Sequence, residues 1–230
     1  MLLCNVSCAA NQFLQPNPAF NPYDLAPVIV LGHAPNVLAV GAGVRVGSLS
    51  DFIALARAQP GKLSLASSGP GSSSNLSAEL LKFRAQLNIV DVPYRGSSAA
   101  IPDILSGRVD GMVMGVPESL ALLREGRLKA LAVTSEKRAA ALPDVPTFAE
   151  AGVPGYSFPG WLSLFAPKQT PAPLLERLNA VFNRALHSRN LTARFAEQNI
   201  EPAGGPPDVA LALLRSDLEL WKEVLQRKPR

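Results

Sequence analysis

Apolar and polar residues alternate between residues 49 and 134 in a pattern that predicts strands and helices in turn. Apolar positions recur every three or four residues in several segments, and each segment is separated from the next by a short run with strand character. The helices expected from this spacing cover 49–58, 76–85, a segment that follows residues 94–98 and ends at Gly107, and a segment from Pro117 to Gly126. The strands expected between them cover 62–66, 88–92, 109–114 and 128–134.

Strand–helix units of this length predict parallel strands, because each helix carries the chain back to the edge where the next strand begins. The three strand-to-helix loops are therefore expected at one edge of a single sheet. In open sheets of this kind, ligands bind at the carboxyl ends of the strands.

The two ends of the chain show a different pattern. No charged residue occurs between Leu25 and Val44, but Pro27, Gly32 and Pro35 interrupt the run. These interruptions predict two short buried strands rather than a membrane-spanning helix. The remaining expected elements are a short helical segment at 146–152, an extended crossover at 153–166 and three helices. The first of these helices begins at Thr170–Pro171, and the other two cover 191–198 and 208–226.

These elements together predict an α/β protein with two lobes. The second lobe is expected to comprise residues 35–153. The first lobe is expected to be discontinuous and to comprise residues 1–34 and 154–230. Lobes that are joined by extended crossovers can close on a ligand by hinge motion.

Composition narrows the function further. The chain has 230 residues, of which 47% are hydrophobic, so it can form a packed core and is not disordered. Its net charge of +4 comes from basic residues that are scattered along the sequence, and this distribution argues against a nucleic-acid partner. The cysteines and histidines of the chain are Cys4, Cys8, His33 and His187, and their spacings predict no metal site. The two cysteines are interpreted as small buried apolar residues, and whether they pair stays open.

The first two strand-to-helix loops carry the candidate chemistry. Both place glycine and serine directly before a helix, at 67–75 and again at 94–98. Free backbone N–H groups at a helix start, a partial positive dipole and serine hydroxyls together make an anion site. Two such loops side by side predict a site for the carboxylates of a small diacid. The alternative is that these serines only cap their helices.

Other chemistry has little support in the sequence. Residues 69–74 lack the third glycine of a dinucleotide-binding loop, and no phosphate-binding loop of the Gly-Lys-Ser/Thr type is present. No nucleophile elbow of the Gly-x-Ser-x-Gly type occurs either. We therefore predict a protein that is not an enzyme and that needs no cofactor.

Three segments strongly resemble the Bug receptors, which are the TctC-type substrate-binding proteins of tripartite tricarboxylate transporters. The segments are PGKLSLASSGPGSSSNLSAELL, DVPYRGSSAAIPDILSGRVDGMV and GRLKALAVTSEKRAAALPDVPTFAEAGVPGY. The resemblance implies a type II periplasmic binding-protein fold and a receptor that captures a small carboxylate between two lobes. The ligand classes it implies are di- and tricarboxylates, acidic amino acids and aromatic acids.

The resemblance also assigns residues and context. The residues that match the family's binding loops are Ser67, Ser68, Gly71, Ser72, Ser73, Tyr94, Gly96, Ser97 and Ser98, with Met114, Gly115 and Trp161 as further candidates. It implies a periplasmic location and membrane transporter subunits as partners, for a chain that does not itself span the membrane.

The chain departs from the family pattern at its start. The export signal, strand, Gly-Gly loop and helix that family members carry there do not precede the matching residues, so the first lobe is expected to be incomplete in its N-terminal part. Two other functions stay open on the same scaffold, an effector-sensing domain of a regulator and a hydrolase.

Overall fold

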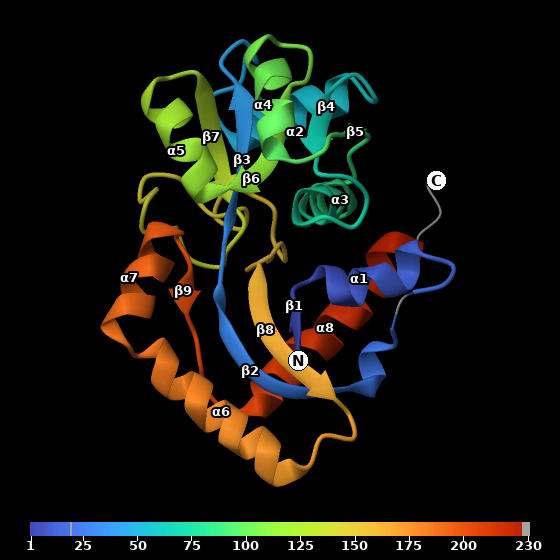
Figure 1. Cartoon of the computed structure of the whole chain (residues 1–230). Coiled ribbons are helices and arrows are strands. Elements are labelled where there is room, and N and C mark those ends of the chain that lie inside the picture. The colour runs from blue at the N-terminus through green and yellow to red at the C-terminus, as the bar shows by residue number, and fades with distance from the viewer. Residues whose placement is uncertain (19, 227–230) are drawn as a thin grey trace. The chain divides into compact units, whose positions relative to one another are not determined.

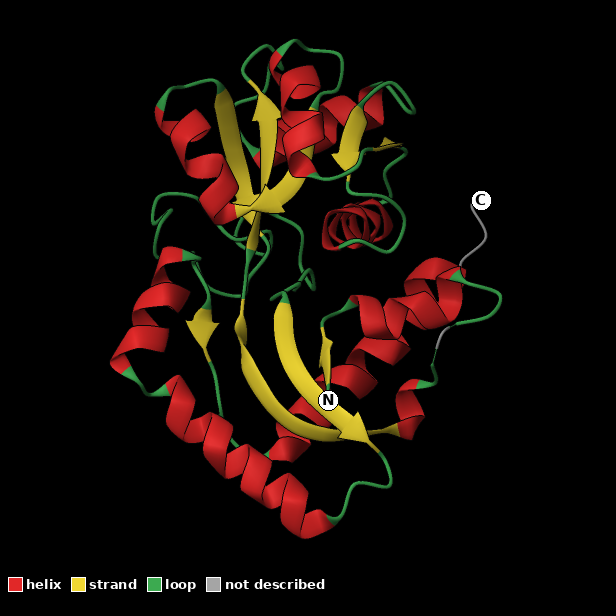
Figure 2. Cartoon of the chain, viewed as in Figure 1, coloured by secondary structure: helices red, strands yellow, loops and turns green. Residues whose placement is uncertain are grey.

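The computed structural model describes residues 1–18 and 20–226, and these form two compact units (Figure 1). One unit comprises Met1–Ala34 together with the chain from Gly160 onward, and we call it unit 1. The other comprises Pro35–Pro159, and we call it unit 2. Each unit has its own sheet, and Figure 2 shows helices packed around both sheets.

Unit 2 contains a five-stranded sheet in the order β5-β4-β6-β3-β7. Its strands are β3 (Asn36–Gly41), β4 (Ser64–Ser67), β5 (Val90–Pro93), β6 (Gly111–Gly115) and β7 (Leu128–Val133), and its helices are α2 (Leu49–Ala58), α3 (Ser73–Ala85), α4 (Ser97–Leu105) and α5 (Val116–Arg124). The strands and helices expected between residues 49 and 134 are confirmed, with ends that move by up to three residues.

The strand directions in unit 2 agree with the expected parallel units. Strand β4 pairs in parallel with β5 and with β6. Strand β3 lies between β6 and β7 and is antiparallel to both, so β7 runs in the same direction as β6. All four residues from Val37 to Val40 are buried, because both faces of this central strand are covered.

Unit 1 contains a four-stranded sheet in the order β1-β8-β2-β9, with antiparallel neighbours. Its strands are β1 (Leu2–Cys4), β2 (Leu25–His33), β8 (Trp161–Pro167) and β9 (Glu201–Pro202), and its helices are α1 (Ser7–Leu14), α6 (Ala172–Leu186), α7 (Arg189–Glu197) and α8 (Pro207–Gln226), with a 3-10 turn at Pro22–Asp24. The residues from Val28 to Val30 are fully buried, which shows that both faces of β2 are covered.

The apolar stretch near the N-terminus forms the two strands that the sequence predicts, β2 and β3. Within residues 1–18 and 20–226, no helix combines the length and apolar composition that crossing a bilayer requires.

The short helix expected at 146–152 is wrong. The Thr147 N–H donates to Glu150 Oε2 at 2.9 Å, and the Glu150 N–H donates to Thr147 Oγ1 at 3.1 Å. This reciprocal pair resembles a capping box and closes a single turn. Gly152 then adopts a φ of +95°, which ends the turn before a helix can propagate.

The start of α6 also differs from the expectation. Thr170 was expected to be the N-cap, but Pro171 takes that position in an extended conformation, without a side-chain hydrogen bond. Proline is tolerated at the start of a helix because the N–H groups of the first turn have no intrahelical partner. Helix α6 therefore begins with Pro171 and Pro173, which flank Ala172, and has no hydroxyl cap.

Residues 154–159 belong to unit 2, whereas the sequence-based boundary put them with the first lobe. The Tyr156 hydroxyl donates to the Ser77 carbonyl at 3.1 Å, and the Phe158 N–H donates to the Thr134 carbonyl at 2.9 Å. The ring of Tyr156 also stacks on that of Phe148, with centroids 4.0 Å apart. These contacts fix the segment to unit 2.

Cys4 and Cys8 form a disulfide bond, which answers the question of their pairing that the sequence leaves open. The bond links the end of β1 to the first turn of α1. The turn at Asn5 and Val6 leads directly into α1 and leaves the two Cα atoms 5.8 Å apart. That separation lies within the range of about 4.4–6.8 Å that a disulfide needs.

Candidate functional site

Three loops meet at the carboxyl edge of the sheet in unit 2. They connect β4 to α3, β5 to α4 and β6 to α5, and β4 lies between β5 and β6 in the sheet. The Tyr94 N–H in the second loop donates to the Ser67 carbonyl at 2.8 Å, which ties the first two loops together. The expectation that these loops are neighbours at one edge is therefore confirmed.

The first loop is held in place by its own polar groups. Ser72 is the N-cap of α3, and its hydroxyl donates to the Gly69 carbonyl at 2.6 Å and accepts from the Asn75 N–H at 3.3 Å. The capping alternative therefore holds for Ser72. Gly71 has a φ of +77° and is buried, and its N–H donates to Asn75 Oδ1 at 3.0 Å. Hydrogen bonds within the loop thus hold this conformation.

Ser67, Ser68 and Ser73 each have a partner as well. The Ser67 hydroxyl is fully buried and donates to Asp91 Oδ2 at 3.2 Å, while the Ser68 N–H donates to Ser74 Oγ at 2.9 Å. The Ser73 hydroxyl accepts from Asn36 Nδ2 at 2.8 Å. These contacts use the hydroxyl hydrogen of Ser67, but among the described residues the hydroxyl hydrogens of Ser68 and Ser73 have no acceptor. The first turn of α3 adds backbone N–H groups as further donors.

The second loop has fewer internal hydrogen bonds than the first. Gly96 is the N-cap of α4 with a φ of +108°, and it supplies no side-chain cap. In the part of the chain that the structure describes, neither the hydroxyls nor the backbone N–H groups of Ser97 and Ser98 have a hydrogen-bond partner. Ser98 is exposed and Ser97 is half-buried. The start of α4 therefore presents neutral donors to an incoming anion, assisted by the helix dipole.

Tyr94 faces a different partner. Its hydroxyl donates to Asp103 Oδ2 at 2.8 Å, and this hydrogen bond raises the pKa of Tyr94. The same bond, with one from Arg108 Nη1 to Asp103 Oδ1 at 3.0 Å, lowers the pKa of Asp103. The Tyr94 side chain thus fixes the loop to the body of α4, and its hydroxyl hydrogen is already used.

The third loop offers fewer donors. Met114 is 2% exposed and packs in the hydrophobic core. Gly115 is the N-cap of α5, but Pro117 in the first turn has no N–H, and the acidic Glu118 lies in the same turn. The start of α5 is therefore less suited to an anion than the start of α4.

Trp161 belongs to unit 1, where it begins β8. It is 2% exposed, and its indole N–H donates to Asp217 Oδ2 on α8 at 2.7 Å. Burial raises the pKa of Asp217 to about 6. The part of Trp161 in ligand binding stays a prediction.

Sequence reasoning missed Asn36, which orients Ser73. Asn36 lies at the start of β3 and pairs with Gly115 across the sheet. Its amide reaches the first loop because β3 inserts antiparallel beside β6, and nothing in the local sequence signals that insertion. Among the described residues, no group of three or more histidine, cysteine or acidic side chains is arranged to hold a metal ion.

Comparison with solved structures defines the class of protein. Rpa4515 from R. palustris, solved with adipate, is 35% identical to this chain with a TM-score of 0.82, over 96% of this chain and 75% of that one. MatC from Rhodopseudomonas palustris with bound malate is 29% identical with a TM-score of 0.83, over 97% and 78%. The periplasmic binding protein BugD is 26% identical with a TM-score of 0.83, over 98% and 76%. The chain has the type II periplasmic binding-protein fold.

The family follows from the sequence comparison. The model of the tripartite tricarboxylate transporter family receptor, TctC, matches residues 1–229, and the chain belongs to that family. A curated relative from Pseudomonas sp. (strain P51), the UPF0065 protein in the tcbD-tcbE intergenic region, is 38% identical over 98% of this chain. The chain spans 68%, 62% and 59% of the length of three curated relatives. The resemblance to Bug and TctC receptors is confirmed.

Proposed function

We propose that this chain captures a small carboxylate at the carboxyl edge of the sheet in unit 2, as the substrate-binding receptor of a tripartite transporter. The observation that carries the proposal is the start of α4, where the hydroxyls and N–H groups of Ser97 and Ser98 are free to donate. The adjacent first loop adds the N-terminal turn of α3, and hydrogen bonds within the loop hold its conformation. Two relatives that were solved with adipate and with malate support a dicarboxylate as the ligand.

The ligand contacts are proposed to come mainly from the backbone. Ser68, Gly71, Ser72 and Ser73 shape the first loop, and Gly96 gives close approach to α4 because nothing lies within 4 Å of the position of a Cβ there. Gly115 contributes through the third loop. The other candidates have side chains that are buried or already hydrogen-bonded, and they are Ser67, Tyr94, Met114 and Trp161. Such side chains position the loops, and direct contact between them and the ligand stays a prediction.

A hydrolase finds less support in the same residues. Both histidines of the chain, His33 and His187, belong to unit 1, whereas the candidate nucleophile Ser72 is in unit 2 and donates its hydroxyl hydrogen to the Gly69 carbonyl. A serine nucleophile needs an adjacent general base, and Ser72 has none among its hydrogen-bond partners. We therefore favour a receptor without enzymatic activity. Its proposed location is the periplasm and its proposed partners are membrane subunits of the transporter, in keeping with its family.

The test is ligand binding by wild type and by variants at Ser97. Ser97 is the first residue of α4, a position where proline is tolerated, so Ser97→Pro removes one N–H and one hydroxyl while the helix can persist. Ser97→Ala removes the hydroxyl alone. A hydrogen bond to a charged group contributes about 1.5–3 kcal/mol, so we expect Ser97→Pro to weaken adipate binding at least about tenfold.

Ser106→Ala serves as the matched control, because Ser106 lies just beyond the other end of α4 and its hydroxyl donates to the Asp103 carbonyl. Isothermal calorimetry with adipate, malate and the uncharged adipamide measures the effect. The proposal is refuted if adipamide binds as well as adipate, or if Ser97→Pro and Ser106→Ala bind adipate equally well.

A further inference from the structure

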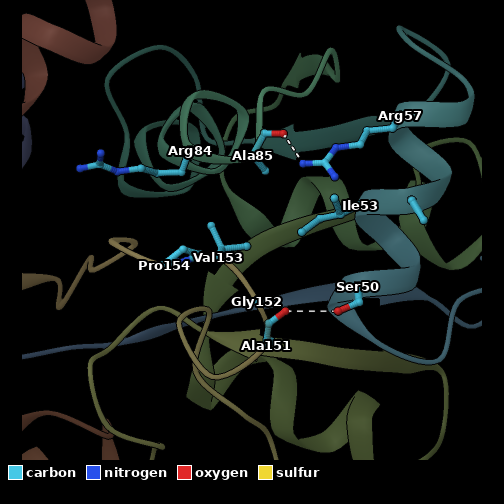
Figure 3. Close-up of a pocket in the computed structure, with 10 residues that line it drawn as sticks. Ser50, Ile53, Arg57, Arg84, Ala85, Ala151, Gly152, Val153 and Pro154 are labelled. Atoms are coloured by element: carbon cyan, nitrogen blue, oxygen red, sulfur yellow. Dashed lines mark hydrogen bonds between the residues drawn. The ribbon is translucent and has the colours of Figure 1, made fainter.

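A separate pocket lies in unit 2, between one face of α2, the C-terminal end of α3 and the turn at residues 151–154 (Figure 3). Its volume is about 350 Å³. Four of its lining residues lie on one face of α2, and the others come from the C-terminal end of α3 and from the turn at 151–154. The lining residues are Ser50, Ile53, Ala54, Arg57, Arg84, Ala85, Ala151, Gly152, Val153 and Pro154.

Two hydrogen bonds fix the walls of this pocket. The Ser50 hydroxyl donates to the Ala151 carbonyl at 3.3 Å and holds the turn against α2. Arg57 Nη2 donates to the Ala85 carbonyl at 3.0 Å and joins α2 to the end of α3 (Figure 3). The pocket is thus built by contacts within unit 2, because each wall is tied to a neighbouring one.

Buried apolar residues line part of the pocket, and its charged lining residues are all basic. Ile53, Ala85 and Val153 are each less than 9% exposed. Arg57 and Arg84 belong to none of the ion pairs in the described part of the chain, and no acidic residue is among the lining residues. Arg84 lies at the rim with its guanidinium directed away from the other lining side chains (Figure 3).

Arg57 is an exposed residue that lines the pocket, and its guanidinium has further hydrogen-bond donors. Only its Nη2 has a partner among the described residues, so Nε and Nη1 stay available. By engaging the Ala85 carbonyl, Arg57 also offsets the partial negative charge at the end of α3, which otherwise disfavours an anion. A guanidinium beside apolar surface matches a carboxylate that carries a hydrocarbon chain.

We propose that this pocket is a second ligand site, which binds an aliphatic monocarboxylate with its carboxylate on Arg57 and its chain on Ile53, Ala54 and Val153. It is distinct from the neutral-donor site at Ser97 and Ser98, because it is lined by other elements and holds its ligand with a formal cation. The proposal stands whether or not the Ser97 site binds dicarboxylates.

The probe is hexanoate, with hexan-1-ol as an uncharged analogue of the same chain length. Each is titrated into the ¹⁵N-labelled chain, and the backbone amide signals are followed by NMR. We expect hexanoate to move the signals of residues 50–57 and 151–153 in a saturable way, and hexan-1-ol to bind those residues at least about fivefold more weakly, because a charge-assisted hydrogen bond is lost.

Three variants test the assignment. Arg57→Gln is expected to weaken hexanoate binding at least about fivefold, and Ala54→Leu is expected to abolish it by filling the pocket while leaving both arginines in place. Arg124→Gln is the matched control, since Arg124 also lies in the last turn of a helix of unit 2, α5, and does not line the pocket. The melting temperature of each variant verifies that it is folded.

The outcomes separate the two sites. The proposal is overturned if hexanoate shifts no signals, or shifts only those of residues 94–98. It is also overturned if hexan-1-ol binds as well as hexanoate, or if a folded Ala54→Leu variant binds hexanoate as well as wild type does. Adipate binding at residues 94–98 tests the receptor function independently. Failure of adipate there with a hexanoate response at 50–57 refutes the receptor site and leaves the second site standing.

Discussion

Replacement of Asp217 by asparagine tests whether burial of a carboxylate beside Trp161 costs stability at neutral pH. Asp217 lies on α8 and accepts a hydrogen bond from the Trp161 indole N–H at 2.7 Å. Burial raises its pKa from the ordinary value of 3.8 to about 6, and the hydrogen bond from Trp161 opposes part of that rise. Asparagine preserves an acceptor for Trp161 and removes the charge.

The expected magnitude follows from the elevated pKa. An elevation from 3.8 to about 6 corresponds to about 3 kcal/mol at 1.36 kcal/mol for each pH unit. The residue is partly accessible to solvent, which screens its charge, so we expect an effect of about 2 kcal/mol.

The sign follows from proton linkage. The folded state binds the proton more tightly than the unfolded state, so the contribution of Asp217 to stability is complete below about pH 3.8 and is lost as the pH rises through about 6. We therefore expect Asp217→Asn to be more stable than wild type at pH 7.5, and this advantage to disappear near pH 4.

Urea unfolding of wild type and Asp217→Asn at several pH values between 4 and 7.5 measures this difference. Glu219→Gln is the control, because Glu219 is an exposed acid two residues further along α8. The reasoning is refuted if the difference between wild type and Asp217→Asn does not change with pH, or if asparagine lowers the free energy of unfolding at pH 7.5.

Two further predictions concern stability. Gly160→Ala is expected to lower the free energy of unfolding by about 2–4 kcal/mol, because Gly160 has a φ of +63° and an added Cβ clashes with the Ala34 carbonyl oxygen. Gly43→Ala is the control, with open space and no positive φ, and is expected to change stability by less than about 0.5 kcal/mol. Equal urea midpoints for these two variants contradict the steric argument. A Cys4→Ser, Cys8→Ser variant lacks the disulfide bond, and its free energy of unfolding is expected to fall by about 2 kcal/mol, since the closed loop is short. A reductant is expected to lower the melting temperature of wild type but not of this variant. An unchanged melting temperature of wild type on reduction counts against that prediction.

Much of unit 2 is determined by local sequence. The spacing of Leu49, Phe52, Ile53 and Ala56 places one apolar face on α2, and all four residues are buried. Repeated strand–helix units then fix the parallel directions of β4, β5 and β6, because a helix between two strands returns the chain to the same edge. The candidate loops at one edge of the sheet follow from these local patterns alone.

The state of each candidate side chain depended on contacts that are distant in sequence. Ser73 is oriented by Asn36, which is 37 residues away, and the Trp161 indole is held by Asp217, which is 56 residues away. The pocket at Arg57 needs α2, the end of α3 and the turn at 151–154 together. No local pattern reports such pairings, because they depend on how elements that are far apart in the sequence pack together.

The sequence by itself determined the family, the helices and strands of unit 2, and the two loops rich in glycine and serine, since each depends on residues close together in the chain. Only the tertiary structure decided which serines still have free donors. Ser72 closes its own helix, whereas Gly96 supplies no cap and leaves Ser97 and Ser98 free to donate. The physical reason is that a hydroxyl can bind an anion only with hydrogen-bonding capacity that its neighbours in space have not already taken.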